Sequence, residues 1–109
     1  MEKKLQAECF QWHWNSVPEE RKRLFHVNQK ARNAIEGNKM RALGVVSGVS
    51  DLIYLGPGGK TVFIEMKTET GKQSPNQIEF ENMVKGLGFE YAICRSLEDF
   101  KHIIKRLNL

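Results

Sequence analysis

The alternation of apolar and polar residues between residues 48 and 67 predicts a β-hairpin. Two apolar runs flank a Gly-Pro-Gly-Gly turn at residues 56–59, and such a turn between alternating runs is typical of a hairpin. In an antiparallel pair, the start of the first strand meets the end of the second. Side chains alternate along a strand, so Glu65 and Lys67 share one face. We therefore expect Asp51, Glu65 and Lys67 to converge at the open end of the hairpin.

Helical and strand patterns on both sides of the hairpin predict the remaining elements. Residues 1–16 have an amphipathic helical pattern, and residues 21–27 contain a short apolar strand. After the hairpin, Ser74 followed by proline begins a helix, residues 89–94 form a strand, and Ser96 caps a last helix. The order is helix, strand, helix or loop, hairpin, helix, strand, helix. This order predicts an α/β sandwich around one mixed sheet.

The segment between the first strand and the hairpin, residues 28–44, is polar and basic. Gly44 stands where a helix would end. Two interpretations are open: an exposed helix with solvated cations, or an element that contacts phosphates and adds affinity without reading sequence. The net charge of +4 favours an anionic partner only mildly. The candidate DNA-contacting cations are Lys30, Arg32, Lys39, Arg41 and, beyond the hairpin, Lys72.

Length and composition are those of one soluble domain spanning residues 1–109, with 40% hydrophobic and 28% charged residues. Cys9 and Cys94 lack the spacing of a metal site, which favours a reduced, buried pair. No apolar run approaches the roughly 18 to 20 residues of a membrane span, and no signal peptide opens the chain. We therefore expect an intracellular, cytoplasmic protein without a membrane partner.

Two carboxylates beside one lysine suit metal-dependent hydrolysis of a phosphodiester. Magnesium held by one or two carboxylates keeps coordination positions for a substrate phosphate. A lysine two residues after a ligand glutamate can orient the attacking water and neutralise developing charge. Glu-x-Lys triplets are common by chance, but this one ends a buried apolar run, where charges are costly without a use. The alternative is a structural ion pair of Lys67 with Glu65 or with Asp51.

Other chemistry-bearing residues have structural interpretations when they are considered alone. Glu8 lies at the edge of the first helix's apolar stripe, as a solvated acid would. A lone histidine such as His26 is more often structural than catalytic. The Trp12-His13-Trp14 run is typical of packing at the edge of a core.

The order of these motifs resembles the PD-(D/E)xK nuclease superfamily, most closely its VRR-NUC branch of virus-type replication-repair nucleases. The matching positions are Glu8, residues 25–28, residues 37–44, Gly48-x-Ser50-Asp51, Glu65-Met66-Lys67, Gly71, Ser74 and Gln77. They cover nearly the whole chain, which resembles a stand-alone VRR-NUC domain. Ser50 stands where the superfamily name has proline, and a serine keeps the following aspartate in place.

The resemblance implies a restriction-endonuclease-like α/β/α sandwich around a mixed central sheet, with a role for each matching residue. The implied ligands of magnesium or manganese are Asp51, Glu65, the backbone carbonyl of Met66 and, often through water, Glu8. Lys67 would orient or help to activate the attacking water. Gln77 would hold a substrate phosphate or a catalytic water.

The leading hypothesis is a metal-dependent, structure-selective DNA endonuclease that acts as a homodimer on branched DNA such as Holliday junctions. The resemblance implies DNA cleavage, and stand-alone members resemble dimeric junction resolvases. A small unit has little surface for a branched duplex, and symmetric cutting of two strands needs two sites. The candidate apolar residues for the dimer are Trp12, Trp14, Phe89, Tyr91 and Leu107.

Two competing hypotheses remain. A non-catalytic DNA-binding module would keep the fold, but such forms usually lose the lysine or an acid, and all are present here. A regulator of protein partners with a structural ion-pair cluster would show no magnesium dependence.

Overall fold

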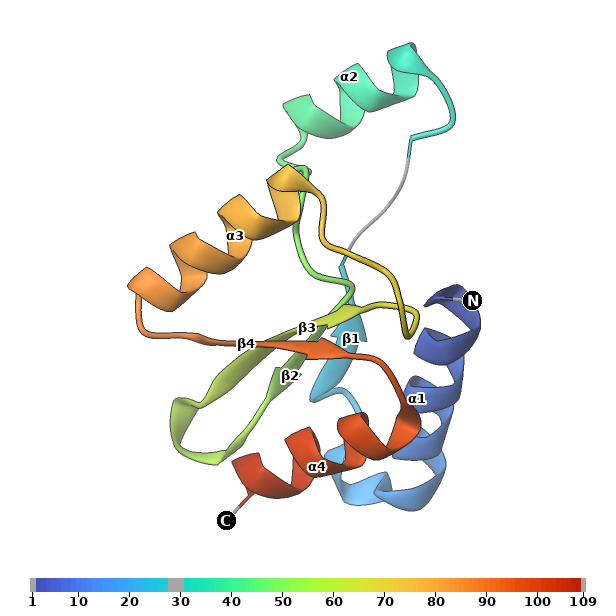
Figure 1. The fold of residues 1–109 in the computed structure, drawn as a ribbon, viewed down its shortest axis with the longest axis vertical. Helices are drawn as coiled ribbons and strands as arrows, with labels where there is room; N and C mark the ends of the chain where they lie inside the picture. The colour runs from blue at the N-terminus through green and yellow to red at the C-terminus, as the bar shows by residue number, and fades with distance from the viewer. Residues whose placement is uncertain (1, 28–30, 109) are drawn as a thin grey trace.

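A four-stranded mixed sheet organises the computed structural model of the protein, which describes residues 2–27 and 31–108 (Figure 1). The strands are β1 (Leu24–His26), β2 (Leu52–Leu55), β3 (Thr61–Met66) and β4 (Glu90–Cys94), in the spatial order β1-β2-β3-β4. The first three strands pair antiparallel, and β4 pairs parallel to β3. The predicted hairpin is β2 and β3, joined by the short 3-10 helix η2 (Pro57–Gly59).

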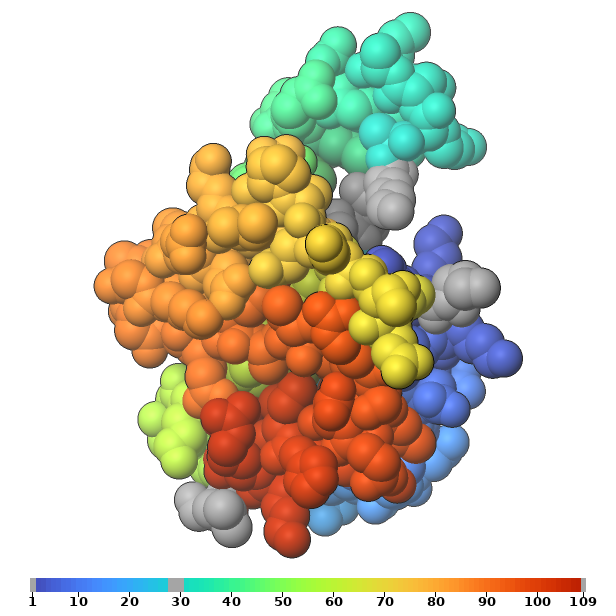
Figure 2. Space-filling view, in the orientation of Figure 1, coloured from blue at the N-terminus to red at the C-terminus, as the bar shows by residue number. Residues whose placement is uncertain are grey.

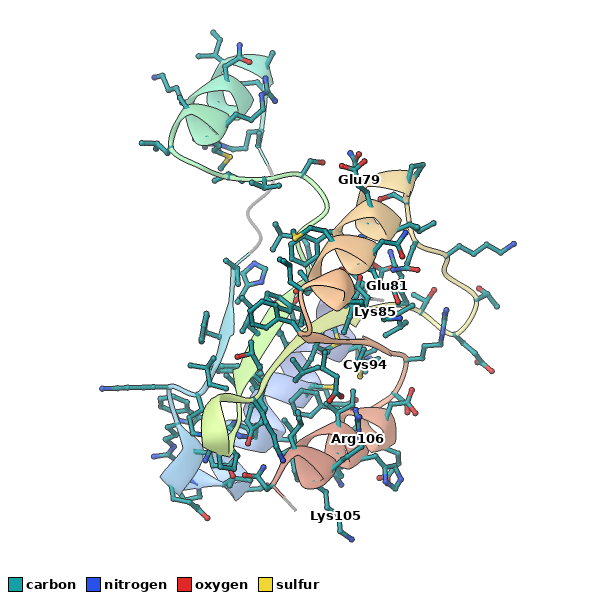
Figure 3. The ribbon with its side chains drawn as sticks, turned by 90° about the vertical axis from the view of Figure 1, so that its left-hand side faces the viewer. Glu79, Glu81, Lys85, Cys94, Lys105 and Arg106 are labelled. Carbon is teal, nitrogen blue, oxygen red and sulfur yellow. The ribbon has the colours of Figure 1, made fainter. Side chains whose placement is uncertain are left out.

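The described residues form four α-helices: α1 (Glu2–Ser16), α2 (Ala34–Ala42), α3 (Pro75–Gly86) and α4 (Leu97–Leu107). A short 3-10 helix, η1 (Pro18–Glu20), follows α1. Figure 3 shows α3, with Glu81 and Lys85, on one side of the sheet and α4, with Lys105 and Arg106, on the other. The predicted α/β/α sandwich is confirmed. Within the two described ranges, no helix combines the length and the apolarity that crossing a membrane requires.

The main core lies between the sheet and the pair α1 and α4. Alternate residues of the strands point to this side, because the side-chain period of a strand is two. The fully buried members include Cys9, Leu52, Tyr54, Val62, Ile64, Met66, Cys94 and Phe100. On the other face, Phe63 meets Phe80 of α3 edge to face at 5.4 Å. The strands that carry the predicted site are therefore fixed by packing on both faces.

A buried polar network, which sequence patterns did not indicate, attaches η1 to α1 and to the hairpin. The imidazole Nε2 of His13 lies 2.9 Å from Oε1 of Glu20, and the Tyr54 hydroxyl donates to the same oxygen at 2.8 Å. Arg23 lies 3.4 Å from the other oxygen. Burial works to raise the pKa of Glu20, but the hydrogen bonds from His13 and Tyr54 outweigh it, so the pKa is lowered. A buried charge satisfied in this way holds β1 at the edge of the sheet.

Helix α2 stands apart from the body of the molecule, as the ribbon and the space-filling view show (Figure 1, Figure 2). None of its residues is buried, and Ile35 and Leu43 are 70% and 86% exposed. The side chain of Asn33 caps it by accepting the N–H of Glu36. Within the described part of the basic segment predicted between the first strand and the hairpin, Ala34–Ala42 therefore forms an exposed helix. A lone helix of this length is marginal in water, so a partner would stabilise it.

The chain between α2 and β2 is held against the start of α3 at Gly48. This residue has φ of +89°, and a Cβ added to it would lie 2.3 Å from the backbone oxygen of Asn76. The Asn76 side chain donates to the Ser47 hydroxyl at 2.9 Å. This close approach places the start of β2, and with it Asp51.

Replacement of Gly48 by alanine should destabilise the protein more than the same change at Gly44. Both glycines have positive φ, but an added Cβ at Gly44 meets nothing within 4 Å. Gly44→Ala should cost about 1 kcal/mol of backbone strain, and Gly48→Ala about 2 kcal/mol or more because the α3 backbone must also shift. Urea unfolding of both variants measures the difference. Equal losses would show that the contact with Asn76 does not constrain the loop.

Candidate active site

The structure brings Asp51, Glu65 and Lys67 together at the open end of the hairpin. Leu52 pairs with Ile64, and continuing this antiparallel register places Asp51 opposite Glu65. The backbone N–H of Met66 donates to Oδ2 of Asp51 at 2.7 Å. The ammonium nitrogen of Lys67 lies 3.8 Å from Oε2 of Glu65. The strand pairing alone thus assembles two carboxylates and one cation.

Glu65 is a buried carboxylate with one oxygen left unpaired. Glu65 is 1% exposed and Lys67 is 6% exposed. Oε2 of Glu65 accepts a hydrogen bond from Nε2 of Gln77 at 2.8 Å. Oε1 is buried without a hydrogen-bond partner among the described residues. Because a buried carboxylate oxygen without a partner is costly, this atom is suited to a ligand that is a cation.

Gln77 is held by the start of α3 and orients Glu65. Ser74 and Gln77 form a capping box, in which the backbone N–H of Ser74 donates to Oε1 of Gln77 at 2.9 Å. The amide nitrogen of Gln77 is then directed to Glu65. Gln77 therefore approaches the site from α3, and its side-chain amide N–H donates to the Glu65 carboxylate.

The environment of Glu65 disfavours its charged form. Burial is the main cause that raises the pKa of Glu65 to about 8, followed by the negative charge of Asp51. The ammonium of Lys67 opposes this rise, and the charge of Glu2 adds to it. One lysine therefore does not compensate for two adjacent carboxylates, and a further positive charge would stabilise both in the ionised form.

The donor set fits magnesium better than a metal that needs nitrogen or sulfur. Across residues 2–27 and 31–108, no group of three or more His, Cys, Asp or Glu side chains is arranged to hold a metal ion. Among the described residues, the oxygen donors at the hairpin end are the carboxylates of Asp51 and Glu65 and nearby backbone carbonyls. Mg²⁺ is commonly held by one or two carboxylates with water and phosphate completing its shell, whereas zinc prefers histidine and cysteine. The unpaired Oε1 of Glu65 supports the same fit.

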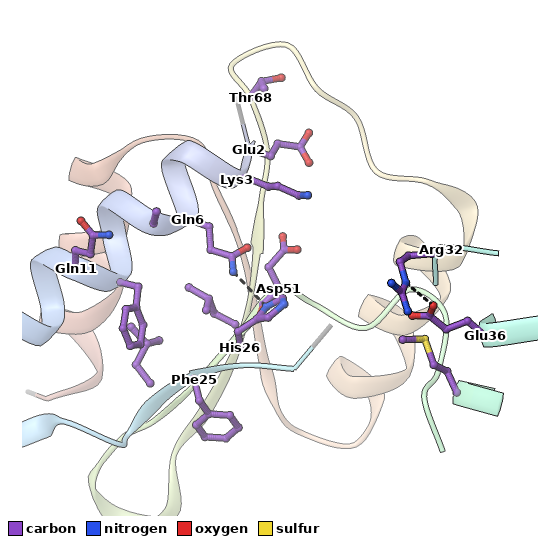
Figure 4. Close-up of a pocket in the computed structure, with 15 residues that line it drawn as sticks. Glu2, Lys3, Gln6, Gln11, Phe25, His26, Arg32, Glu36, Asp51 and Thr68 are labelled. Atoms are coloured by element: carbon purple, nitrogen blue, oxygen red, sulfur yellow. Dashed lines mark hydrogen bonds and ion pairs between the residues drawn. The ribbon is translucent and has the colours of Figure 1, made fainter. Parts of the chain in front are cut away.

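A cleft of about 1250 Å³ opens beside this site, lined by α1, the β1 edge, α2 and the segment after β3 (Figure 4). Asp51 lies in its wall between Glu2 and Lys3 of α1 and Arg32 and Glu36 of the α2 region. The cleft therefore reaches the candidate site at Asp51, whereas Glu65 and Lys67 lie behind its wall and are nearly inaccessible.

The first helix directs Glu2, and not Glu8, toward the carboxylate pair. Glu2 lines the cleft and contributes to the raised pKa of Glu65. Glu8 is exposed and does not line the cleft. At 3.6 residues per turn, Glu8 lies about 120° around the helix from Glu2. Gln6 and Phe10, at successive steps of four from Glu2, line the same cleft, and this spacing is the signal that could have identified Glu2.

His26 contacts the backbone of Asp51, a role that the sequence did not indicate. Its Nδ1 lies 2.7 Å from the carbonyl oxygen of Asp51 and 3.2 Å from Nε2 of Gln6. Since a carbonyl only accepts, we assign the proton to Nδ1 on the shorter contact. His26 thereby fixes the main chain at Asp51 from the edge strand.

Of the predicted DNA-contacting cations among the described residues, only Arg32 lines the cleft. Arg32 pairs with Glu36 at 2.8 Å. Lys39 and Arg41 are exposed on α2, and Lys72 is exposed after β3. Lys30 lies outside the described residues.

Metal-free protein should lose stability as the pH rises, because of Glu65. With its pKa raised from 4.5 to about 8, the folded state binds this proton more tightly than the unfolded chain. The stabilisation is therefore complete below pH 4.5 and is lost as the pH rises through 8. In EDTA, the melting temperature of the wild-type protein should fall more between pH 5 and pH 8.5 than that of Glu65→Gln, which cannot ionise. An equal fall in melting temperature for the two proteins over this pH range would contradict the raised pKa of Glu65.

Comparisons with known proteins agree with this fold. The family model of the VRR-NUC domain matches residues 2–98. A solved structure titled "VRR_NUC domain protein" superposes with a TM-score of 0.75 at 19% identity, covering 97% of this chain and 86% of that chain. Another, titled "VRR_NUC domain", has a TM-score of 0.61 at 17% identity, covering 91% of this chain and 92% of that chain. No curated protein matches the chain.

The family match extends from α1 through the hairpin and α3 to the start of α4, so it includes each element of the candidate site. The resemblance seen in the sequence motifs and the predicted fold are both confirmed. The chain belongs to the VRR-NUC domain family, which implies a nuclease-type function in DNA processing.

Proposed function

We propose that the protein is a divalent-metal-dependent DNA endonuclease that hydrolyses phosphodiester bonds in branched DNA such as Holliday junctions. The observation that carries this proposal is the buried Glu65 carboxylate, which faces Asp51 and has one oxygen without a partner among the described residues. A structural ion pair would satisfy its own carboxylate oxygens. Here a single lysine at 3.8 Å leaves a charge deficit that a divalent cation fits.

The proposed metal ligands are Asp51, Glu65 and the backbone carbonyl of Met66. When bound, Mg²⁺ or Mn²⁺ would polarise the scissile phosphate and lower the pKa of a bound water. The Met66 N–H donates to Oδ2 of Asp51 and so fixes the carboxylate, which leaves Oδ1 to bind the metal. Gln77 keeps the Glu65 carboxylate in one orientation.

Lys67 and Glu2 are the proposed groups around the attacking water. The ammonium of Lys67 is nearly buried beside Glu65, where it can donate to the water and offset charge that develops on the phosphate. Glu2 reaches into the cleft from α1, in the position that the family resemblance led us to expect for Glu8. A carboxylate there can accept a hydrogen bond from the water and hold it for in-line attack.

The cleft and α2 support a substrate as large as DNA. Arg32 in the cleft wall, Lys39 and Arg41 on α2, and Lys72 after β3 are the proposed phosphate contacts. Because α2 projects from the body, Asp51 lies between α1 on one side and the α2 region on the other, and a bent or branched duplex can contact both. The selectivity for branched DNA rests on this shape and on the family resemblance.

The proposed active form is a homodimer, because symmetric cutting of a junction needs two sites. The candidate interface residues differ in their exposure within the monomer. Tyr91 and Leu107 are buried within the monomer, so they are not available to a partner copy. Trp12 is half-buried and packs on Phe100. Trp14 and Phe89 are exposed and remain candidates.

Asp51→Asn should abolish cleavage and preserve the fold. An asparagine oxygen can still accept the Met66 N–H, so the hairpin end keeps its hydrogen bond, while the charge that attracts the metal is lost. Cleavage of an end-labelled four-way junction in Mg²⁺ should fall by at least about 100-fold. Lys67→Ala should also lose cleavage. Binding of the junction in EDTA should remain, since the phosphate-contacting cations are unchanged.

The same assay tests the competing hypotheses. Flap, fork and linear duplex substrates run in parallel would identify the preferred DNA. If Asp51→Asn cleaved the junction at the wild-type rate, the assignment of Asp51 as a metal ligand would be contradicted. Binding without cutting by the wild-type protein in Mg²⁺ and in Mn²⁺ would favour the non-catalytic DNA-binding module.

Glu2→Gln and Glu8→Gln form a matched pair that tests which helix acid serves the site. Both variants remove one negative charge from α1, but only Glu2 lines the cleft. Glu2→Gln should lower the cleavage rate roughly 10- to 100-fold, and Glu8→Gln should cut at the wild-type rate. Single-turnover kinetics on the junction measure both. A loss confined to Glu8→Gln would reverse the assignment.

A further inference from the structure

One guanidinium nitrogen gathers three backbone carbonyls of the loop that follows Lys67. Nη1 of Arg95 donates to the oxygen of Thr68 at 2.7 Å and to that of Gly71 at 2.8 Å, and it lies 3.3 Å from that of Glu69. The loop has little regular structure of its own beyond a turn in which the Gly71 N–H donates to the Thr68 oxygen at 3.2 Å. Its conformation therefore depends on the arginine.

The sheet topology places Arg95 beside this loop. Because β3 and β4 are parallel, their carboxyl ends meet at one edge of the sheet, and the Lys67 N–H donates to the Cys94 oxygen at 3.0 Å. Arg95 is the first residue after β4. Its own backbone N–H donates to Oδ2 of Asp99 at 3.0 Å, in the first turn of α4. The main chain that carries the guanidinium is thus fixed.

The opposite side of the loop faces the candidate active site. Thr68 lines the cleft together with Asp51 and Glu2 (Figure 4). A Cβ added at Gly71 would lie 2.8 Å from the Thr68 hydroxyl oxygen and 3.5 Å from Oε2 of Glu2. This close packing leaves no room for a side chain at Gly71 without displacement of its neighbours. The loop consequently lies between Arg95, which binds its carbonyls, and the carboxylate of Glu2.

We propose that Arg95 is a positioning residue of the nuclease site, which acts through the loop at residues 68–71 to hold Glu2 over the Asp51 and Glu65 pair. The inference rests on the proposed function and assigns Arg95 no contact with DNA or metal. Without the cation, three carbonyl oxygens directed at one point repel one another, and the loop moves away. Glu2 then loses the surface that keeps it in the cleft.

The geometry of the contact determines which substitutions of Arg95 test the proposal. All three carbonyls meet the same nitrogen, so an ammonium group, which has three N–H donors on one atom, can take its place. Arg95→Lys should therefore still hold the loop at residues 68–71 in place. Arg95→Met keeps an unbranched, flexible side chain but is shorter and has no donor. Arg106→Met is a matched control, because it removes the same charge at the opposite end of β4, where Arg106 pairs with Glu90.

The test combines a measurement on the protein alone with metal binding and kinetics. Amide hydrogen exchange at Gly71, followed by NMR in EDTA, should be faster in Arg95→Met than in the wild-type protein and slow again in Arg95→Lys. Affinity for Mn²⁺, measured by calorimetry without DNA, should fall in Arg95→Met alone. On the four-way junction, kcat of Arg95→Met should fall roughly 10- to 100-fold with KM within about threefold of wild type. Arg106→Met should match wild type in every measurement.

The outcomes separate this inference from the proposed function. If the Gly71 amide of Arg95→Met exchanged at the wild-type rate and this variant bound Mn²⁺ with wild-type affinity, the positioning role would be overturned, whether or not the protein cuts DNA. A rise in KM alone would overturn it too, because it would make Arg95 a phosphate contact. If the wild-type protein cut none of the DNAs while Arg95→Met still lost Mn²⁺ affinity, only the proposed function would be contradicted.

Discussion

Burial of the Glu65 carboxylate beside Asp51 is the interaction on which the candidate site depends. A carboxylate that is 1% exposed, with an acid as its neighbour and one oxygen that no described residue pairs with, is costly for a folded protein. Several elements position its neighbours: the Met66 N–H holds Asp51, the capping box of α3 holds Gln77, and β3 carries Lys67 beside it. These contacts fix the carboxylates without neutralising them. The protein is therefore preorganised for a positive ligand.

The topology of the sheet explains why so many polar groups meet at one edge. The antiparallel hairpin joins the start of β2 to the end of β3, and the parallel pairing brings the end of β4 to the same edge. Asp51, Glu65, Lys67 and Arg95 all lie within one residue of these strand ends or on their last residues. Rigid strands therefore supply the geometry, and the α2 projection and the loop after β3 are left to contact a substrate.

Local patterns predicted the hairpin, its polar end and the start of α3, because each depends on residues close in sequence. The turn at residues 56–59 fixes the register that places Asp51 opposite Glu65, and Ser74 with Pro75 fixes where Gln77 lies on its helix. Which acid of the first helix faces the cleft could not be predicted in this way, since the rotation of α1 depends on distant partners. His13 is buried because Glu20 and Tyr54 meet it, and this orientation turns Glu2 toward the cleft and Glu8 to solvent. No local pattern contains that information.

The most direct measurement of the central claim is the pKa of the Glu65 side chain itself, followed by carboxyl carbon NMR with and without Mg²⁺. In EDTA the carboxyl should titrate near pH 8. Saturating Mg²⁺ should lower this pKa to well below its ordinary value of 4.5, because a bound cation stabilises the ionised form. A metal-free pKa near 4.5, or one that Mg²⁺ leaves unchanged, would contradict a metal site at this carboxylate pair.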